Sequence, residues 1–278
     1  MREVLARLTP PAFEKGSVWL VGSGPGDPGL LTLHAVHALA TADVVLHDAL
    51  VAPEILRLVP GAHLISVGKR AGGTRIPQLQ INQRLIALAQ AGHRVVRLKG
   101  GDPLVFGRGG EEAVALASAG IPFRIVPGIT AGIGGAASAS VPITHRSLAR
   151  SVAFATGADS SGAVPDSLDL AALSRGADVL VLYMGTRRIA PIAARLIEAG
   201  RSHAEAVAFI TDATTARQAI RIATLATAEA TAASIPARGA TLIVIGPVIA
   251  VRDVIAPLQQ TDPMTLLAHR AQDLGDQA

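Results

Sequence analysis

The sequence predicts an α/β protein of two domains, the first built on a five-stranded parallel sheet and the second on a mixed sheet. Three observations support this prediction. A chain of 278 residues with 50% hydrophobic and 17% charged residues can bury two modest cores. Short β-rich runs alternate with helical stretches over residues 17–126, the pattern of parallel α/β units. Loops rich in Gly, Asp and Pro fall where these runs end, and beyond residue 146 the strand spacing becomes irregular.

Five strands alternate with helices in the first half. The helix that begins at Pro77 is the longest, and it places Ile81, Leu85 and Leu88 on one face. The expected strands are residues 17–21, 44–46, 64–67, 94–98 and 123–126, and the expected helices are 30–40, 54–58, 77–91 and 111–119. Ligands of open parallel sheets bind outside the carboxyl ends of strands, so the loops at these ends predict one shared site.

An Ala/Gly/Ser-rich helix over residues 131–140 is expected to lead into the second domain, with residues 141–146 (VPITHR) as the hinge. Strands are expected at 151–156, 177–183, 206–210 and 241–245, with a further candidate at 217–223, and helices at 189–199 and 226–233. We therefore divide the chain into a flexible arm (1–16), an N-terminal domain (17–135), a C-terminal domain (136–257) and a frayed tail (258–278).

Composition excludes several classes of function. Cysteine is absent, which removes disulfides, thiolate zinc sites and a cysteine nucleophile. Aromatic residues make up 3% of the chain, which argues against a platform that stacks nucleic-acid bases and leaves a nucleic-acid-binding protein as a weak alternative. The chain opens without a charged-then-apolar leader, and its longest apolar run, near 240–251, is shorter than the about 20 residues of a membrane span. The net charge of +4 favours an anionic partner, but a solvated surface with a small arginine excess explains it equally well.

The loop GSGPGDPG, residues 22–29, invites comparison with the dinucleotide-binding fingerprint but departs from it. Gly22 and Gly24 fit, whereas Asp27 stands where the third glycine should be. Pro25 also removes an amide donor that a pyrophosphate would use. The loop therefore fits another ligand best, a structural turn is the next alternative, and dinucleotide binding is the least favoured of the three.

The stretch RLKGGDPLVFGRGGEE, residues 97–112, carries the densest signal for a ligand. Gly100 and Gly101 allow a ligand close to the backbone, and Asp102 can accept hydrogen bonds from hydroxyl or amine groups. Arg108 offers a planar, permanently charged fork to a carboxylate. Five glycines and an aspartate in one stretch of 16 residues are hard to explain by structure alone, so we expect a binding site here.

Further polar residues follow the second and third strands. Asp48 suits a general base or a ribose-binding carboxylate, and a turn or helix cap is the alternative. Lys69 and Arg70 follow the third strand without the Ser/Thr and upstream glycine of a P-loop, so a solvated basic loop is as reasonable as a site. His34 and His37 have a spacing that a metal could use, but without a third ligand they fit surface or core histidines better.

Taken together, these motifs resemble the tetrapyrrole methyltransferase family over residues 16–252, and most closely its branch that methylates uroporphyrinogen III. The similarity rests on seven motifs in the same order: residues 21–33 (VGSGPGDPGLLTL), 43–51 (DVVLHDALV), 67–72 (VGKRAG), 97–112, 122–132 (PFRIVPGITAG), 141–146 and 181–185 (VLYMG). Ser23, where many relatives carry alanine, and Leu104 and Val105, where bulkier residues are common, are mild departures.

The resemblance implies the class III fold of S-adenosyl-L-methionine methyltransferases, two α/β domains in a homodimer with the active site in the interdomain cleft. It implies S-adenosyl-L-methionine as methyl donor, S-adenosyl-L-homocysteine as product, and uroporphyrinogen III and precorrin-1 as substrates on the way to precorrin-2. It implies donor contacts at Pro25, Gly100, Gly101, Asp102, Val105, Thr130, Ala131, Met184 and Ala213, proton transfer at Asp48 and Lys69, and substrate binding at Arg108.

We further expect a cytoplasmic enzyme that needs no metal, nucleic acid or membrane, and a later precorrin methyltransferase of the same fold is the nearest alternative. The chain lacks the N-terminal dehydrogenase and chelatase module of fused sirohaem synthases, so a single activity is expected.

The acceptor is a carboxylate-rich macrocycle, which suits a cleft near Arg108. By charge alone we add four further arginines: Arg70, Arg75, Arg146 and Arg150. Because a pyrrole carbon is already nucleophilic, alignment of the reactants and removal of a proton by Asp48 are the main tasks.

Overall fold

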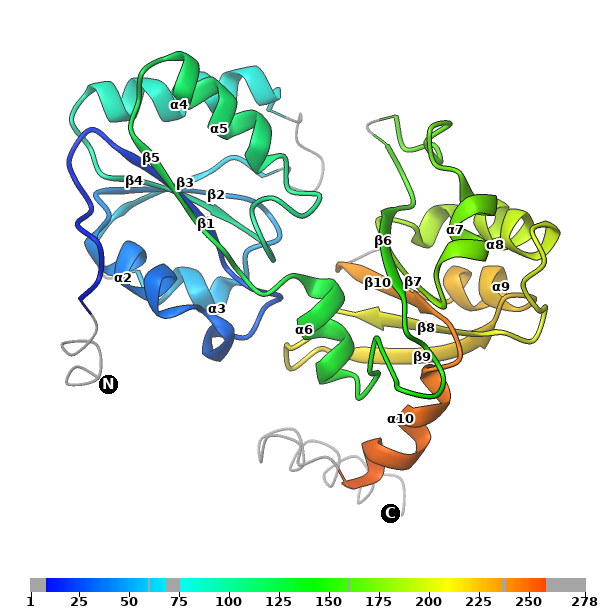
Figure 1. The fold of residues 1–278 in the computed structure, drawn as a ribbon. Coiled ribbons are helices and arrows are strands. Elements are labelled where there is room, and N and C mark those ends of the chain that lie inside the picture. Colours follow the sequence, from blue (N-terminus) through cyan, green and yellow to red (C-terminus); the bar gives the residue numbers. More distant parts are fainter. Residues whose placement is uncertain (1–8, 60, 69–75, 160, 237–238, 259–278) are drawn as a thin grey trace. The chain divides into compact units, whose positions relative to one another are not determined.

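The computed structural model describes residues 9–258 except 60, 69–75, 160 and 237–238. The chain divides into two compact units, with the boundary between Gly135 and Ala136 (Figure 1). Lys69, Arg70 and Arg75 lie outside the described residues, as does the expected tail from residue 259 onward. Each unit is described by itself below.

The sheet of the first unit contains five parallel strands in the order β3-β2-β4-β1-β5. The strands are β1 (Val18–Gly22), β2 (Val44–His47), β3 (His63–Ser66), β4 (Val95–Lys99) and β5 (Phe123–Val126). This arrangement confirms the predicted five-stranded parallel sheet. Because all the strands run the same way, their exit loops gather at one edge.

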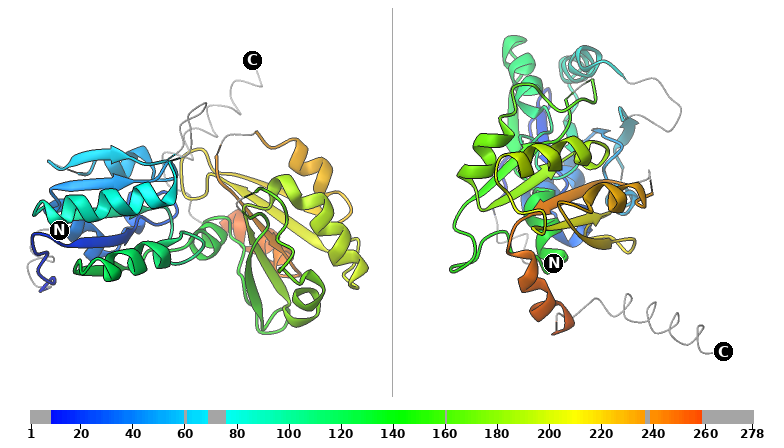
Figure 2. Two further views of the ribbon diagram at one scale, coloured as in Figure 1. Left: turned by 90° about the horizontal axis from the view of Figure 1, so that it is seen from above. Right: turned by 90° about the vertical axis from the view of Figure 1, so that its right-hand side faces the viewer.

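Helices cover both faces of this sheet. Helices α2 (Leu33–Thr41) and α3 (Pro53–Leu56) lie on one face, and α4 (Gln78–Gln90) and α5 (Gly109–Ser118) lie side by side on the other (Figures 1 and 2). Successive residues of a strand point to opposite faces, so Val96 and Leu98 of β4 pack with α2 and α3 while Val95 packs with α4 and α5. The same alternation turns Arg97 and Lys99 toward α4 and α5.

The first helix differs from its expected extent, residues 30–40. A 3-10 turn, η1 (Pro28–Leu30), is separated from α2 by two extended residues. The second of these, Thr32, has φ −69° and ψ 154°, and its Oγ1 accepts a hydrogen bond from the backbone N–H of Ala35 at 3.2 Å. This N-cap starts a new helix and so breaks the predicted one.

Part of the expected N-terminal arm packs onto the first unit. Phe13 is buried, and its ring stacks on that of Trp19 with centroids 4.5 Å apart. The backbone N–H of Gly16 donates to the carbonyl of His93 at 3.1 Å. Phe13 and Gly16 therefore attach the end of the expected arm to the first unit, whereas residues 1–8 of that arm lie outside the described residues.

The second unit is built on a mixed sheet in the order β6-β7-β10-β8-β9. Strands β6 and β7 pair in parallel, and the other neighbours pair antiparallel, which confirms the predicted mixed sheet. The strands are β6 (Val152–Thr156), β7 (Val179–Tyr183), β8 (Ala206–Thr211), β9 (Ala219–Thr224) and β10 (Thr241–Ile245). The candidate strand at 217–223 thus corresponds to β9.

The second sheet also has a core on each face. Helices α7 (Leu170–Gly176), α8 (Ile189–Glu198) and α9 (Ala228–Ala233) pack on one face, and α6 (Ala131–Ser138) and α10 (Ile249–Ile255) contribute to the other. Two 3-10 turns, η2 (Thr186–Arg188) and η3 (Ala256–Leu258), complete the unit. Helices α7 and α10 were not predicted, although Asp169, whose Oδ1 accepts from the N–H of Ala172 at 2.9 Å, is a cap signal for α7. No helix in the described part of the chain is long and apolar enough to cross a membrane.

Candidate active site

The loops that follow β1, β4 and β5 meet at the carboxyl edge of the first sheet. Gly24 and Gly101 exchange two backbone hydrogen bonds of 3.1 and 2.8 Å. A methyl group on Gly128 would lie 2.2 Å from the carbonyl oxygen of Gly101, and one on Gly22 would lie 2.6 Å from the Cα of Gly128. The three loops therefore approach each other more closely than any side chain would allow.

Asp102 fastens two of these loops together. Its Oδ1 accepts a hydrogen bond from the N–H of Leu104 at 2.8 Å, within its own loop. Its Oδ2 accepts from the N–H of Gly128 at 3.1 Å, in the loop after β5. Because each carboxylate oxygen has more than one acceptor site, the half-buried Asp102 keeps the capacity to bind a ligand as well.

Other predicted donor contacts of the first unit lie around this junction. Thr130 is 8% exposed and directly precedes Ala131, the first residue of α6. A methyl group on Gly134 of the same helix would lie 3.0 Å from the Cγ of Pro25, so α6 packs closely on the loop after β1. Val105 is half-buried in the loop after β4. The structure thus brings all these residues to three adjacent strand ends.

The two predicted contacts in the second unit lie in unusual backbone. Met184 directly follows β7, with a φ of 57° and 55% exposure. Ala213 follows β8 between Asp212 and Thr214, which have φ values of 47° and 64°. Strands β7 and β8 both pair antiparallel with β10, so they run in the same direction and their carboxyl ends share one edge. Left-handed conformations in residues other than glycine are costly and concentrate at functional sites.

Asp48 lies beside the same edge of the first sheet, directly after β2. A methyl group on Gly68 would lie 2.1 Å from the backbone nitrogen of Ala49, and one on Gly100 would lie 3.1 Å from the Cβ of Leu50. The turn that begins at Asp48 is therefore packed against the exits of β3 and β4. The cap alternative for Asp48 is not supported, because the N-cap of α3 is Ala52 and that helix has no side-chain cap.

The carboxylate of Asp48 is the part-exposed end of a buried ionic cluster that sequence reasoning missed. We use the name ionic cluster for Asp48, Arg97, Lys99 and Glu112. The side chains of Arg97, Lys99 and Glu112 are 2%, 3% and 0% exposed, whereas that of Asp48 is 30% exposed. The available signal was two cations on alternate positions of an apolar strand, followed by a glutamate in the first turn of the next helix.

Both cations of the ionic cluster bind both carboxylates. Arg97 donates from Nη2 to Oδ1 of Asp48 at 2.5 Å and from Nε to Oε1 of Glu112 at 2.9 Å. The Nζ of Lys99 donates a hydrogen bond to Oε1 of Glu112 at 3.2 Å. The same nitrogen lies 3.1 Å from Oε2 of Glu112, where the two groups form an ion pair but no hydrogen bond. It also lies 3.7 Å from Oδ2 of Asp48. Two cations and two anions make the cluster formally neutral.

Burial acts differently on the two cations. For Lys99, burial and the positive charge of Arg97 outweigh the two carboxylates and lower the pKa. For Arg97, burial also disfavours the charged form, but the attraction of Asp48 and Glu112 together outweighs burial, so the pKa of Arg97 is raised. Arg97 is therefore the permanent cation of the cluster.

Arg108, the predicted substrate-binding residue, is exposed and paired with Glu111 in the first turn of α5, the helix that it precedes. Its Nε and Nη2 donate to the two carboxylate oxygens of Glu111 at 2.8 and 2.6 Å. Its φ is 60°, and that of Phe106 in the same loop is 51°. Exposed ion pairs of this kind contribute little stability, so a substrate carboxylate could displace Glu111 at small cost. In the second unit Arg146 and Arg150 are also exposed, and the Nε of Arg150 donates to the carbonyl of Arg146 at 3.3 Å.

The described residues contain no group of three or more His, Cys, Asp or Glu side chains that could hold a metal ion. His34 is exposed, and the ring of His37 lies 5.9 Å from that of Trp19. The two histidines therefore behave as a surface residue and a core residue.

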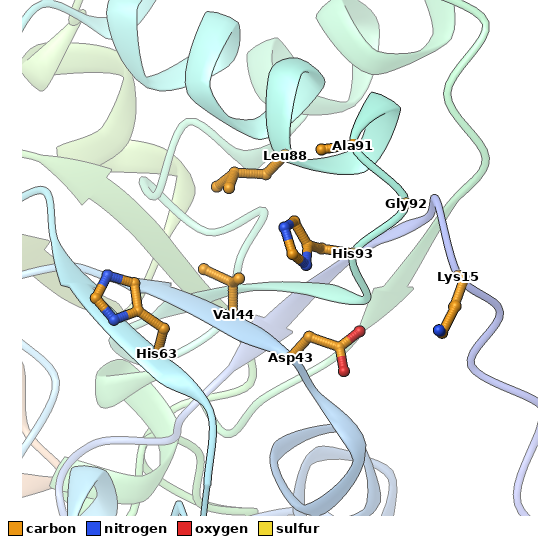
Figure 3. A pocket seen from close by; sticks show the side chains of 8 residues that line it. All are labelled: Lys15, Asp43, Val44, His63, Leu88, Ala91, Gly92 and His93. Carbon is orange, nitrogen blue, oxygen red and sulfur yellow. The ribbon is translucent and has the colours of Figure 1, made fainter.

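A cavity of about 590 Å³ opens at the opposite end of the first sheet (Figure 3). It is lined by Lys15, Asp43, Val44, His63, Leu88, Ala91, Gly92 and His93, at the amino ends of β2 and β3 and the turn after α4. Asp43 is already bound by Arg94, with Oδ1 3.0 Å from Nη2. Ligands of parallel sheets bind at the carboxyl ends of strands, so we assign the site to the loops and not to this cavity.

Residues 17–229 match the family model described as Tetrapyrrole (Corrin/Porphyrin) Methylases. A uroporphyrinogen-III C-methyltransferase from Sinorhizobium sp is 55% identical over 243 residues, 87% of each chain. Siroheme synthase 2 of Aeromonas hydrophila is 52% identical over 87% of this chain, which spans only 51% of that longer relative.

Solved structures show the same similarity. Uroporphyrin-III C-methyl transferase from Thermus thermophilus, complexed with S-adenyl homocysteine, is 39% identical with a TM-score of 0.73 and covers 84% of this chain and 99% of its own. A cobalt precorrin-4 methyltransferase is 26% identical with a TM-score of 0.74, over 84% of this chain and 96% of its own.

Proposed function

Because the chain belongs to the tetrapyrrole (corrin/porphyrin) methylases, we propose that it transfers methyl groups from S-adenosyl-L-methionine to carbon atoms of uroporphyrinogen III. The observation that carries this proposal is the 55% identity to a uroporphyrinogen-III C-methyltransferase over 87% of both chains. We further propose that two transfers occur, through precorrin-1 to precorrin-2, and that the enzyme is a homodimer. The later precorrin methyltransferase stays the second candidate, and its lower identity of 26% disfavours it.

The junction of the three loops fits a methyl donor. Gly100 and Gly101 present partly exposed backbone without side chains, and the left-handed φ of Gly101, 66°, turns that backbone sharply. Asp102 beside them can accept from hydroxyl or amine groups. The bound donor supplies an electrophilic methyl group on its sulfonium. We propose that these residues, with Pro25, Val105, Thr130 and Ala131, bind and orient it, and that Met184 and Ala213 of the second unit complete its contacts.

Two kinds of residue would act on the tetrapyrrole acceptor: a cation that binds its carboxylates and a carboxylate that accepts its proton. Arg108 can exchange Glu111 for a carboxylate of the macrocycle, and so fix its orientation. Alignment of the pyrrole carbon with the methyl group, at roughly 3 to 3.5 Å, supplies much of the rate. We propose that Asp48 accepts the proton released as the positive charge of the methylated pyrrole is quenched, and Lys69 stays a predicted participant in proton transfer.

The proposal is tested by incubating the purified protein with uroporphyrinogen III and S-adenosyl-L-methionine under anaerobic conditions and measuring product mass. We expect a product with two added methyl groups and an intermediate with one. A product that stops at one methyl group contradicts the double transfer. Absence of any methylated product, while precorrin substrates are methylated, favours the second candidate instead.

A further inference from the structure

We propose that Glu112 is a positioning residue of this site, which acts through Arg97 and Lys99 to fix the carboxylate of Asp48 and to maintain its basicity. This inference rests on the proposed function, because it takes Asp48 as the proton acceptor. Glu112 lies in the first turn of α5 and is fully buried, so it does not meet the substrate itself.

Glu112 is held in place by three hydrogen bonds, all to its Oε1. Its Oε1 accepts hydrogen bonds from the Nε of Arg97 at 2.9 Å and the Nζ of Lys99 at 3.2 Å, both on β4. The Nε2 of Gln78 on α4 donates to the same oxygen at 3.0 Å, and it also donates to Oδ1 of Asn82 at 3.0 Å. The position of Glu112 is therefore determined by a strand and a neighbouring helix, and it in turn orients both cations.

Stability alone does not account for the ionic cluster. Burying ionised groups costs several kcal/mol for each ion, and well-packed apolar side chains are often neutral or better. The neighbouring positions Val95, Val96 and Leu98 of β4 are fully buried apolar residues, so an apolar continuation was available. At the amino ends of β2 and β4, the ion pair between Asp43 and Arg94 joins the same two strands while both side chains stay partly exposed, so linking these strands does not require buried charges. The buried cluster is therefore explained best by the one member that it presents to solvent, Asp48.

The charges define what Glu112 contributes. Without it, Asp48 would be the only anion facing two cations, and its proton affinity would fall. With it, each cation is shared between two carboxylates, so Asp48 is oriented by Arg97 without losing its capacity as a base. The ring of His47 also lies near Asp48, with its Nδ1 3.2 Å from the backbone carbonyl oxygen of Asp48.

The test is Glu112→Gln, which keeps the size of the side chain and removes its charge. We expect kcat to fall at least tenfold, because a weaker base transfers protons more slowly. We expect the acid limb of the kcat profile to move to lower pH. The KM for the donor and the calorimetric affinity for S-adenosyl-L-homocysteine should stay within twofold, because the side chain of Glu112 accepts from Gln78, Arg97 and Lys99 and not from the glycines of the loop junction. Unchanged kcat, or a parallel loss of donor affinity, overturns the proposal.

Two further variants make the result specific. Asp43→Asn removes the matched ion pair at the other ends of the same two strands, and it should leave kcat and the pH profile unchanged. Glu112→Asp keeps the charge on a shorter side chain, so the acid limb should stay in place while kcat falls, and this variant decides the question if Glu112→Gln does not fold. An inactive wild-type enzyme refutes the proposed function, whereas an active wild type with an equally active Glu112→Gln refutes only the role of Glu112.

Discussion

The Nη2 of Arg97 lies 2.5 Å from the Oδ1 of Asp48, so a fully buried cation holds a carboxylate that reaches the surface. Asp48 directly follows β2 and Arg97 lies on the adjacent strand β4, and the pairing of these strands aligns His47 with Leu98. The direction of the Asp48 carboxylate is therefore set by the core of the first unit and not by a mobile loop. Such an arrangement holds a reactive group in position before a substrate arrives.

Asp48→Asn is expected to bind both substrates and turn over slowly. The amide keeps the size of the side chain but cannot accept the proton, and general bases typically contribute 10²- to 10⁴-fold to the rate. Turnover should therefore fall by about that factor, while calorimetry should show near wild-type affinity for S-adenosyl-L-homocysteine. Wild-type turnover in this variant would remove Asp48 from the chemistry.

The buried charges predict a strong coupling between Arg97 and Glu112. Arg97→Met leaves the buried carboxylate of Glu112 with less compensation, and loss of one partner of a buried pair costs about 3 to 5 kcal/mol. The double variant with Glu112→Met leaves Lys99 facing Asp48 and restores neutrality. We expect it to recover at least half of that loss in urea unfolding. Simple addition of the two single losses would show that the charges act independently.

Asp102→Ala is expected to abolish measurable donor binding for two reasons. It removes an acceptor from the proposed donor site, and it breaks the link to the N–H of Gly128 that joins two loops. Calorimetry with S-adenosyl-L-homocysteine measures the loss. Asp169→Ala, which removes a helix cap in the second unit, is the control and should bind normally. Wild-type affinity in Asp102→Ala would mean that the loop has another role.

Gly128→Ala is expected to be severely destabilising and to prevent donor binding. Its new methyl group would lie 2.2 Å from the carbonyl oxygen of Gly101, so the loop junction must open. Gly110→Ala is the matched control, because nothing lies within 4 Å of its added methyl group. In helix α5 that change should be neutral or stabilise by up to about 1 kcal/mol. Equal urea midpoints for the two variants would contradict the close approach of the loops.

The Asp43–Arg94 pair predicts a loss of stability in acid. The side-chain and backbone hydrogen bonds from Arg94 lower the pKa of Asp43 to about 2, from an ordinary value of 3.8. A carboxyl group with a depressed folded-state pKa stabilises the protein above the unfolded pKa, and this contribution is lost as pH falls from about 4 toward 2. Because the pair is partly exposed, we expect up to about 1 kcal/mol. Asp43→Asn should flatten the change in urea midpoint across this interval, and an unchanged slope would contradict the assignment.

The elements were predictable where local pattern and tertiary packing agree. Apolar runs such as residues 44–46 became strands because both of their faces are buried. The glycines at 22, 101 and 128 were recognisable as sites of close backbone approach, and the loops that contain them do meet. Helix α7 was missed because its cap residue, Asp169, directly follows a polar loop, so the start of the short helix is hard to tell from the loop in the sequence.

By itself, the sequence determined the alternation of strands and helices, the glycine loops and the family, because periodicity and motif order are local properties of the chain. Only the tertiary structure decided which charges meet. Asp48 precedes Arg97 by 49 positions, and Glu112 follows it by 15. They come together because β2 and β4 are neighbours in the sheet although β3 lies between them in the chain, and because α5 packs on the face where Arg97 and Lys99 point. Strand order is a property of packing, and no spacing within the sequence encodes it.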